Sequence, residues 1–220
     1  HRLIRRQRQM CIRDRIEVYA LLGAVEWGYE EDGATLLAHL EKIVQYNVQS
    51  SEKEKFDGVM LDIEPYISDS WKENPEEYMD RYISCMKKGY KFAQKNHLRT
   101  AICIPRHYDN QGLTSGLEEL IKETCDEVAV MNYSCGNEIE AIRTEAALSE
   151  KYGKELHCIL EFQEVGKHGL TENKTYRNKG IDNAKETWEK LQKEYKNINV
   201  TRDYHWSRPV REMLEEKNAD

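Results

Sequence analysis

Short apolar runs alternate with longer segments of helical periodicity along most of the chain. The runs are rich in Val, Ile and Leu and end in Gly, Pro or polar residues, as is typical of buried β-strands. The longer segments place apolar side chains three or four residues apart, which predicts amphipathic helices. The expected strands are 16–23, 56–64, 100–104, 127–133, 156–162 and 198–206. The expected helices are 35–49, 75–93, 117–125, 138–152, 183–195 and 208–217.

Strands that alternate with helices at this spacing predict a parallel sheet with right-handed crossovers. An open doubly wound sheet and a (β/α)8 TIM barrel both fit the alternation. No strand is followed by a G-x-G-x-x-G or G-x-x-x-x-G-K loop, and polar residues collect where strands end, so the barrel is favoured. Six strands cannot close such a barrel, so we expect two further βα units in the natural protein. We therefore expect an incomplete α/β barrel, strands three to eight, formed by residues 16–220 as one catalytic-type domain.

Residues 1–15 differ from the rest of the chain, because they hold six Arg, one Asp and no apolar periodicity. The run Arg5–Arg15 reads as the translation of a transposase adapter from a sequencing library. That match is more specific than the alternative, a basic arm that binds nucleic acid or a membrane surface. We expect 1–15 to be non-native and the natural protein to be truncated before Ile16. A signal peptide in the missing part would make the protein secreted or bound to the cell surface; without one it would be cytoplasmic.

The remaining chain is acidic. Without the first segment it has 27 Lys and Arg against 39 Asp and Glu, a formal charge of −12. This argues against nucleic acid as a partner, because binding phosphates requires clustered cations. No apolar run approaches the ~18 residues of a membrane-spanning helix. The five remaining Cys are scattered without a C-x-x-C pair and read as small buried hydrophobic residues. We expect no metal ion and no other cofactor.

Side chains suited to chemistry follow the predicted strands. Asp62 and Glu64 end the strand 56–64, where their spacing puts both carboxylates on one face before Pro65 stops the strand. Glycoside hydrolysis uses one carboxylic acid to protonate the leaving oxygen and a second group to stabilise the developing cation. The alternative is an ordinary capping and salt-bridging pair in a loop. Polar and aromatic side chains also end the later strands: Arg106, His107, Asn132, Tyr133, Glu161 and Trp206.

The segment Phe56–Tyr66 resembles the fourth-strand signature of the chitinase-like glycoside hydrolases of family 18 type, D-G-x-D-x-D-x-E, whose members are (β/α)8 barrels. Met60 stands where the family has the first aspartate of the inner triplet. Met131–Tyr133 matches the M-x-Y of the family's sixth strand, and Trp206 matches, more weakly, a tryptophan on its last strand. The matching signature residues are Asp57, Gly58, Asp62 and Glu64.

This resemblance implies a role for each matching residue. Glu64 would be the general acid, and Asp62 would orient the 2-acetamido group of the substrate, which acts as nucleophile. Tyr133 would hydrogen-bond near that group, and the partner would be an oligosaccharide or polysaccharide. Because Met60 offers no carboxyl group to tune Asp62, a non-catalytic carbohydrate-binding barrel is the alternative.

A second resemblance competes with the first. Ile63–Pro65 is similar to the N-E-P that ends the fourth strand in the large clan of retaining barrel glycosidases. On this resemblance Glu64 is the acid/base and Glu161, at the end of the seventh strand, is the nucleophile, at about 5–5.5 Å. Glu164 lies three residues beyond Glu161 and is the weaker candidate. Both resemblances share Glu64.

Other side chains are candidates for sugar binding. Trp27 and Trp71 either stack on sugar faces or belong to the core, and Trp188 is expected in the core because it lies within a helix. A lyase or aldolase on the same barrel is a third class of function, but such enzymes commonly need a lysine or a metal cluster at the strand ends, and the sequence places no obvious one there. The sugar-binding candidates are Tyr66, Arg106, His107, Asn132, Tyr133 and Trp206.

Overall fold

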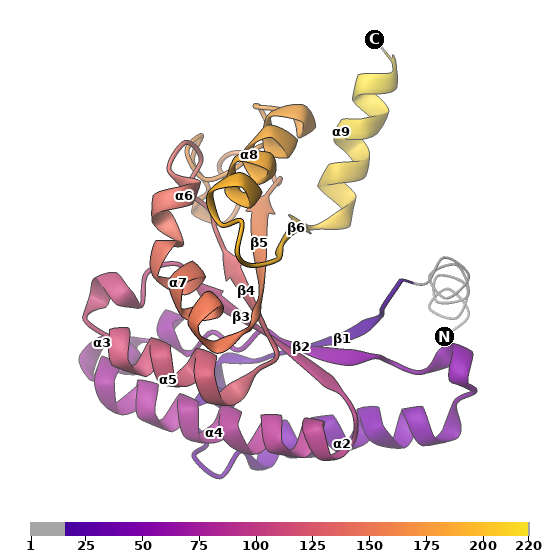
Figure 1. Cartoon of the computed structure of the whole chain (residues 1–220), viewed down its shortest axis with the longest axis vertical. Helices are drawn as coiled ribbons and strands as arrows, with labels where there is room; N and C mark the ends of the chain where they lie inside the picture. Colours follow the sequence, from indigo (N-terminus) through magenta and orange to yellow (C-terminus); the bar gives the residue numbers. More distant parts are fainter. Residues whose placement is uncertain (1–15, 220) are drawn as a thin grey trace. The chain divides into compact units, whose positions relative to one another are not determined.

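The computed structural model of the chain describes residues 16–219 (Figure 1). Six strands alternate with helices and follow one another in the sheet in chain order, from β1 to β6, as in an incomplete α/β barrel. The predicted fold is therefore confirmed, while the adapter prediction falls on 1–15, outside the described residues. The strands are β1 (Tyr19–Leu22), β2 (Gly58–Leu61), β3 (Arg99–Pro105), β4 (Glu127–Met131), β5 (Glu155–Glu161) and β6 (Val200–His205).

Within the described residues a helix is present at every predicted position, although the helix expected over 138–152 is divided in two. None of the helices described is long and apolar enough to span a membrane. The α-helices are α2 (Ala34–Gln49), α3 (Asp69–Glu73), α4 (Pro75–Lys95), α5 (Thr114–Thr124), α6 (Glu138–Ala141), α7 (Arg143–Tyr152), α8 (Ile181–Glu194) and α9 (Ser207–Ala219). The 3-10 helices are η1 (Val25–Tyr29), η2 (Glu52–Glu54), η3 (Pro65–Ile67), η4 (Asp109–Gln111) and η5 (Lys167–Gly169).

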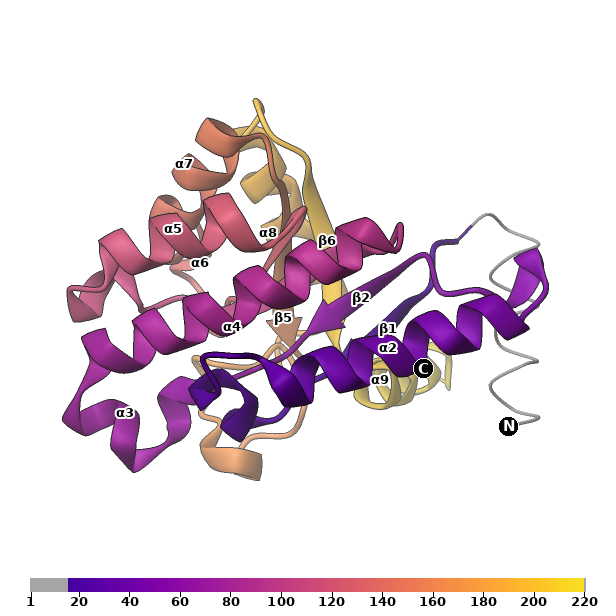
Figure 2. The same ribbon diagram turned by 90° about the horizontal axis from the view of Figure 1, so that it is seen from below.

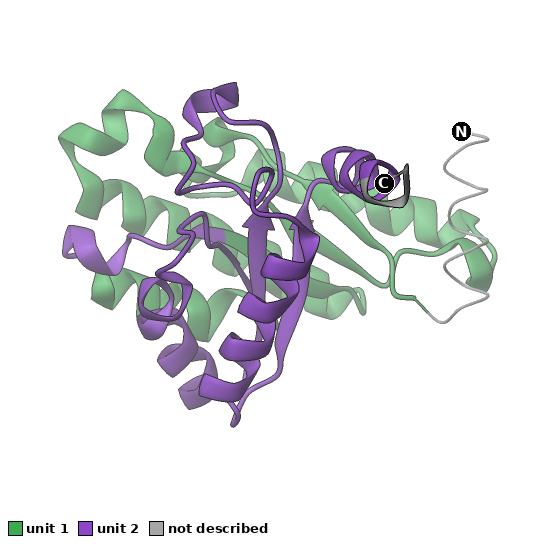
Figure 3. Cartoon of the chain, turned by 90° about the horizontal axis from the view of Figure 1, so that it is seen from above, with its two compact units in different colours: residues 1–103, 113–126 green, residues 104–112, 127–220 purple. Residues whose placement is uncertain are grey.

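The chain divides into two compact units (Figure 3). The first runs up to Cys103 and also holds 113–126; in it β1 pairs in parallel with β2, and β2 with β3. The helices α2 and α4 lie side by side in it (Figure 2), with Gly89 of α4 against Leu36 of α2. An added Cβ at Gly89 would lie 2.6 Å from Leu36, so the missing side chain is what permits this approach.

The second unit holds 104–112 and 127–220, with β4, β5 and β6 in parallel register. The helix α8 covers one face of this sheet, and its Trp188 is fully buried, as predicted. The indole of Trp188 donates to the carbonyl of Cys158 at 2.9 Å and packs against Phe162 and Tyr204. The other face carries the polar side chains that alternate with this apolar set, among them Glu155, His157 and Glu161 of β5.

The cysteine prediction is confirmed for most positions. Cys85, Cys103, Cys125 and Cys158 are buried free thiols, whereas Cys135 is only half-buried. Burial raises the pKa of Cys85 to about 12, and nearby Glu30 adds to the shift. Such a thiol stays protonated and unreactive near neutral pH.

The single helix expected after β4 is two helices, α6 and α7, which are separated at Ile142. The side-chain amide of Asn132 donates to the carbonyl of Glu138 at 2.9 Å, and the hydroxyl of Tyr195 donates to the carbonyl of Ile139 at 2.6 Å. A continuous helix would pair those carbonyls with the N–H groups four residues further on. The prediction of one helix is wrong, because side chains from outside the helix, Asn132 directly after β4 and Tyr195 after α8, bind the carbonyl oxygens at the break.

Gly23, directly after β1, lies against the backbone of Asp62, directly after β2. A Cβ there would be 1.8 Å from the backbone oxygen of Asp62, which also binds β1 through its own N–H. We predict that Gly23→Ala lowers the free energy of unfolding by about 1–3 kcal/mol or more, since only a backbone shift relieves the clash. The comparison is Gly116→Ala, whose new Cβ would lie 2.5 Å from Cγ of the Met79 side chain, so a side-chain shift can relieve this clash and the destabilisation should be smaller. Equal urea midpoints for the two variants would contradict the prediction.

Glu145 of α7 is a buried acid. The residue is 0% exposed, and no other residue hydrogen-bonds to its carboxylate oxygens. Burial raises the pKa of Glu145 to about 7; its own backbone N–H partly opposes the shift, Asp109 adds to it, and Arg106 opposes it. The folded chain therefore favours the protonated acid.

Stability should consequently fall as the pH rises from 4.5, the ordinary pKa, through about 7. Over that interval the folded state holds a proton that the unfolded state releases. The pH-dependent loss is about 3 kcal/mol, and Glu145→Gln should remove it. Thermal unfolding at pH 5 and pH 8 tests this; a variant with the same drop between the two pH values as the parent would refute it.

Candidate functional site

The two carboxylates of the signature follow β2 directly. The alternation of the strand continues past its end, because Ile63 is 1% exposed while Asp62 and Glu64 are half-buried. Both carboxylates therefore lie on the face opposite Ile63, as the spacing predicts. The hydroxyl of Tyr66 donates to the carboxylate of Glu64. Pro65 begins η3, and its carbonyl accepts from the Tyr29 hydroxyl at 3.0 Å, which ties this strand end to η1.

Glu161 ends β5 and is 2% exposed. One of its oxygens accepts from the backbone N–H groups of Phe162 and Gln163, each at 2.7 Å. The other accepts from the Gln163 amide at 3.2 Å and lies 2.8 Å from Nδ1 of His205. Burial by itself would raise the pKa of Glu161, but the hydrogen bonds from His205 and Gln163 outweigh it and lower the pKa. The side chain is thus an ionised carboxylate in a fixed orientation.

His205 is a candidate site residue that the sequence analysis did not single out. It lies opposite Glu161 in the register of β5 and β6, so both side chains share one face of the sheet. Its ring lies 5.9 Å from that of Tyr133, centroid to centroid, and the side chain remains 42% exposed. A buried carboxylate on Nδ1 fixes the tautomer and aims Nε2 outward, the arrangement that prepares a histidine for acid–base work or sugar binding. Its position at the end of the last predicted strand is the feature of the sequence that could have identified it.

Asn132 and Tyr133 are neighbours with opposite placements. Asn132 is 1% exposed and bonded to α6, so its amide serves the fold, and we leave it out of the proposed substrate contacts. Tyr133 is half-buried beside His205. Consecutive side chains at the end of a strand point to opposite faces, so one of the two is buried and the other is accessible.

The remaining candidates divide by exposure. Trp71 is 3% exposed in the first unit, so it belongs to the core and is not placed to stack on a sugar. Trp206 is 48% exposed and, with Gln163 and Arg177, lines a pocket of about 290 Å³ in the second unit. His107, half-buried after β3, has a pKa lowered by burial and by the neighbouring Arg106. That shift keeps the imidazole neutral, so it can both donate and accept hydrogen bonds.

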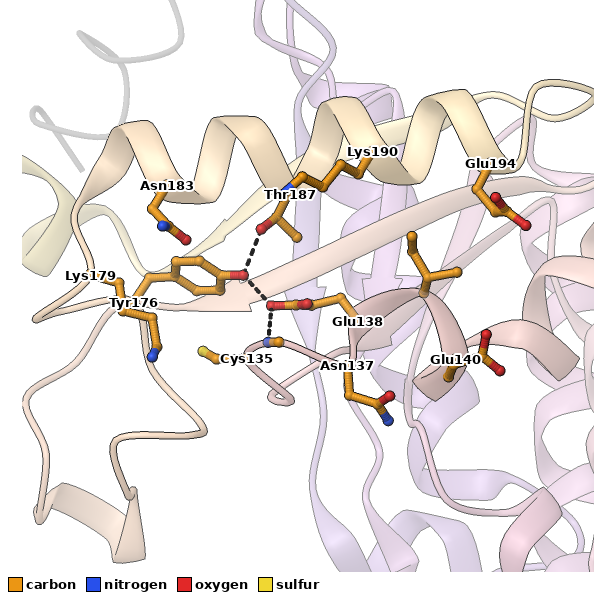
Figure 4. Close-up of a pocket in the computed structure, with 12 residues that line it drawn as sticks. Cys135, Asn137, Glu138, Glu140, Tyr176, Lys179, Asn183, Thr187, Lys190 and Glu194 are labelled. Atoms are coloured by element: carbon orange, nitrogen blue, oxygen red, sulfur yellow. Dashed lines mark hydrogen bonds between the residues drawn. The ribbon is translucent and has the colours of Figure 1, made fainter.

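A larger pocket of about 670 Å³ lies between α6 and α8 (Figure 4). Figure 4 shows the carboxylate of Glu138 at its wall, bound by the Tyr176 hydroxyl and by the N–H of Gly136 at 2.9 Å. The same hydroxyl lies 2.8 Å from that of Thr187. These groups satisfy one another's hydrogen-bonding capacity, and they hold the loop after η5 against α6 and α8.

Among the solved structures that resemble the chain are two of one catalytic domain. One is the Group II chitinase catalytic domain 2 of Ostrinia furnacalis, a mutant in complex with penta-N-acetylchitooctaose, at 14% identity and a TM-score of 0.44. The other is the same domain, at 13% identity and a TM-score of 0.43. Each match covers 76% of this chain and 52% of that one, so the chain spans about half the length of the structures it matches. A likeness at this level has no bearing on activity or substrate. No protein-family model matches the sequence, and no curated protein matches it significantly.

Because the pKa of Glu161 is lowered in the folded chain, the contribution of its hydrogen bonds to stability depends on pH. Its stabilising effect is fully present above the ordinary pKa of 4.5 and is lost as the pH falls through the lower, folded value. We predict that Glu161→Gln lowers Tm by about 4–8 °C at pH 7 and that this gap narrows on acidification below pH 4.5.

The matched control is Glu164→Gln. Glu164 is exposed and pairs with Lys167 at 2.9 Å, and exposed pairs contribute little. Thermal scans from pH 3 to pH 7 should show the same Tm for the control as for the parent. A gap for Glu161→Gln that stays constant with pH would contradict the assignment.

Proposed function

We propose that the chain is the barrel of a glycoside hydrolase in which Glu64 is the general acid. The observation that carries this is the Asp62–Glu64 pair, two half-buried carboxylates on one face directly beyond β2, with Tyr66 hydrogen-bonded to Glu64. Carboxyl ends of strands are where barrel enzymes hold catalytic groups. The match of this segment to the chitinase-like signature gives the same two residues.

The proposed reaction uses the two carboxyl groups differently. Glu64 gives its proton to the glycosidic oxygen as the bond from that oxygen to the anomeric carbon breaks. The carbonyl oxygen of the 2-acetamido group on the substrate bonds to that carbon, while Asp62 orients the group and stabilises its positive charge. Glu64, now ionised, takes a proton from water as the water opens the intermediate.

The alternative in which Glu161 is the nucleophile has less support. Its oxygens already accept hydrogen bonds from two backbone N–H groups and from side chains, and the residue is 2% exposed. A nucleophile must present an oxygen to the anomeric carbon. Glu161 is better suited to orienting His205, and Asp62 keeps the stabilising role. Tyr133 and Trp206 remain proposed sugar contacts.

A carbohydrate-binding barrel without catalysis is the second candidate. Met60 shares the face of Asp62 and offers no carboxyl group to it. Such a barrel would bind the same glycans and release no product.

Glu64→Gln tests the catalytic proposal. We expect kcat/KM on 4-methylumbelliferyl glycosides of N-acetylglucosamine oligomers to fall by about 10²–10⁴-fold, since the amide cannot donate the required proton. Glycan affinity measured by calorimetry should change less than about threefold.

The control is Glu76→Gln, an exposed glutamate at the start of α4, which should keep full activity. Equal turnover by parent and Glu64→Gln would overturn the assignment of the acid. Glycan binding by the parent without cleavage of any member of a broad panel would favour the binding barrel instead.

A further inference from the structure

A second polar cluster lies on the face of the second unit's sheet that is opposite α8, at the other end of the strands from Glu161. Glu127 begins β4 and Glu155 begins β5, and the two are partners in the parallel register. His157 follows two residues after Glu155 and therefore shares its face. A carboxylate oxygen from each glutamate and a ring nitrogen of the histidine all lie within 4.8 Å of one another.

The orientation of His157 is set by a further carboxylate. Its Nδ1 lies 3.0 Å from Oδ2 of Asp203 on β6, and the other oxygen of Asp203 accepts from the Thr201 hydroxyl at 2.9 Å. Its Nε2 is consequently turned toward Glu127, at 2.8 Å. Metal-binding histidines usually have this arrangement, with one nitrogen on a carboxylate and the other aimed at the cation.

Burial makes the cluster costly without a positive charge. The side chain of Glu127 is 4% exposed and that of His157 is 15% exposed. Carboxylates held this close repel one another, more strongly where water is scarce. A bound cation supplies a positive charge there and replaces the hydration that the carboxylates have lost, and as it binds it displaces the proton on Nε2 of His157 to water.

We propose that Glu127, Glu155 and Nε2 of His157 bind a divalent cation of the zinc class, with water in the fourth position and Asp203 as the positioning residue. One imidazole and two carboxylates are ligands that Zn²⁺ accepts in tetrahedral sites. The site lies about 13 Å along β5 from Glu161, four residues away. At the start of the strands its role is structural, because the cation fixes β4 to β5. The proposal does not depend on the glycosidase proposal.

Calorimetric titration of the full, metal-stripped chain with Zn²⁺ tests the site. We expect the parent to bind about one ion at micromolar or tighter affinity. His157→Gln should weaken that affinity about 100-fold or more, and Asp203→Asn about 10–100-fold, through loss of ring orientation. The matched control His168→Gln, at an exposed histidine in η5, should leave it within twofold.

Co²⁺ distinguishes these ligands from cysteine. Cobalt bound by Glu127, Glu155 and His157 should show no thiolate charge-transfer band in the near ultraviolet. Zn²⁺ binding that is absent in the parent, or that is unchanged in His157→Gln, would overturn the proposal, as would a thiolate band.

Two further measurements distinguish loss of the Zn²⁺ site from loss of the fold in the variants. At a hundredfold excess of Zn²⁺ over Kd, the Tm of the parent should rise by about 5–10 °C, and that of His157→Gln should not. Glu155 is half-buried, so Glu155→Gln is the milder variant, and circular dichroism should show it folded. Its Zn²⁺ affinity should fall about tenfold or more; parental affinity in this folded variant would refute the site.

Discussion

The parallel register of β4, β5 and β6 places acidic side chains of neighbouring strands on one face, and the second unit must compensate their charge. Histidines on the same face do so at both ends. His205 lies against Glu161 at the strand ends, and His157 lies between Glu127 and Asp203 near the strand starts. Burial would lower the pKa of His157, but hydrogen bonds to Asp203 and Glu127 outweigh it and raise the pKa to about 9. Without a cation, a proton supplies the positive charge.

The two ends of this sheet are suited to different tasks. At the strand ends, His205 is 42% exposed and can reach a ligand, while the buried carboxylate beneath it fixes its orientation. At the strand starts, the side chains of Glu127 and His157 are nearly enclosed, which favours a fixed structural role. The division agrees with barrel enzymes in general, in which chemistry lies at the carboxyl ends and stability depends on the amino ends.

Most of the fold follows from local pattern. Six apolar runs become six strands: β2 to β5 bury most of their side chains, whereas β1 and β6 bury one each. The helices begin and end within a few residues of their predicted limits. The break at Ile142 does not follow from local pattern. The sequence around Glu138 and Ile139 is ordinary for a helix. Their carbonyl oxygens instead accept hydrogen bonds from the side chains of Asn132 and Tyr195, whose positions depend on tertiary packing.

The sequence by itself determined the order of strands and helices, the alternation along each strand, and the Asp62–Glu64 pair, since these depend only on spacing along the backbone. The tertiary structure decided which candidates are accessible. It buried Trp71 and Asn132, enclosed Glu161 in hydrogen bonds beside His205, and joined Glu127 to His157. Such outcomes depend on which strands become neighbours and in what register, and contacts between residues 30 or more positions apart leave no periodic trace in the sequence.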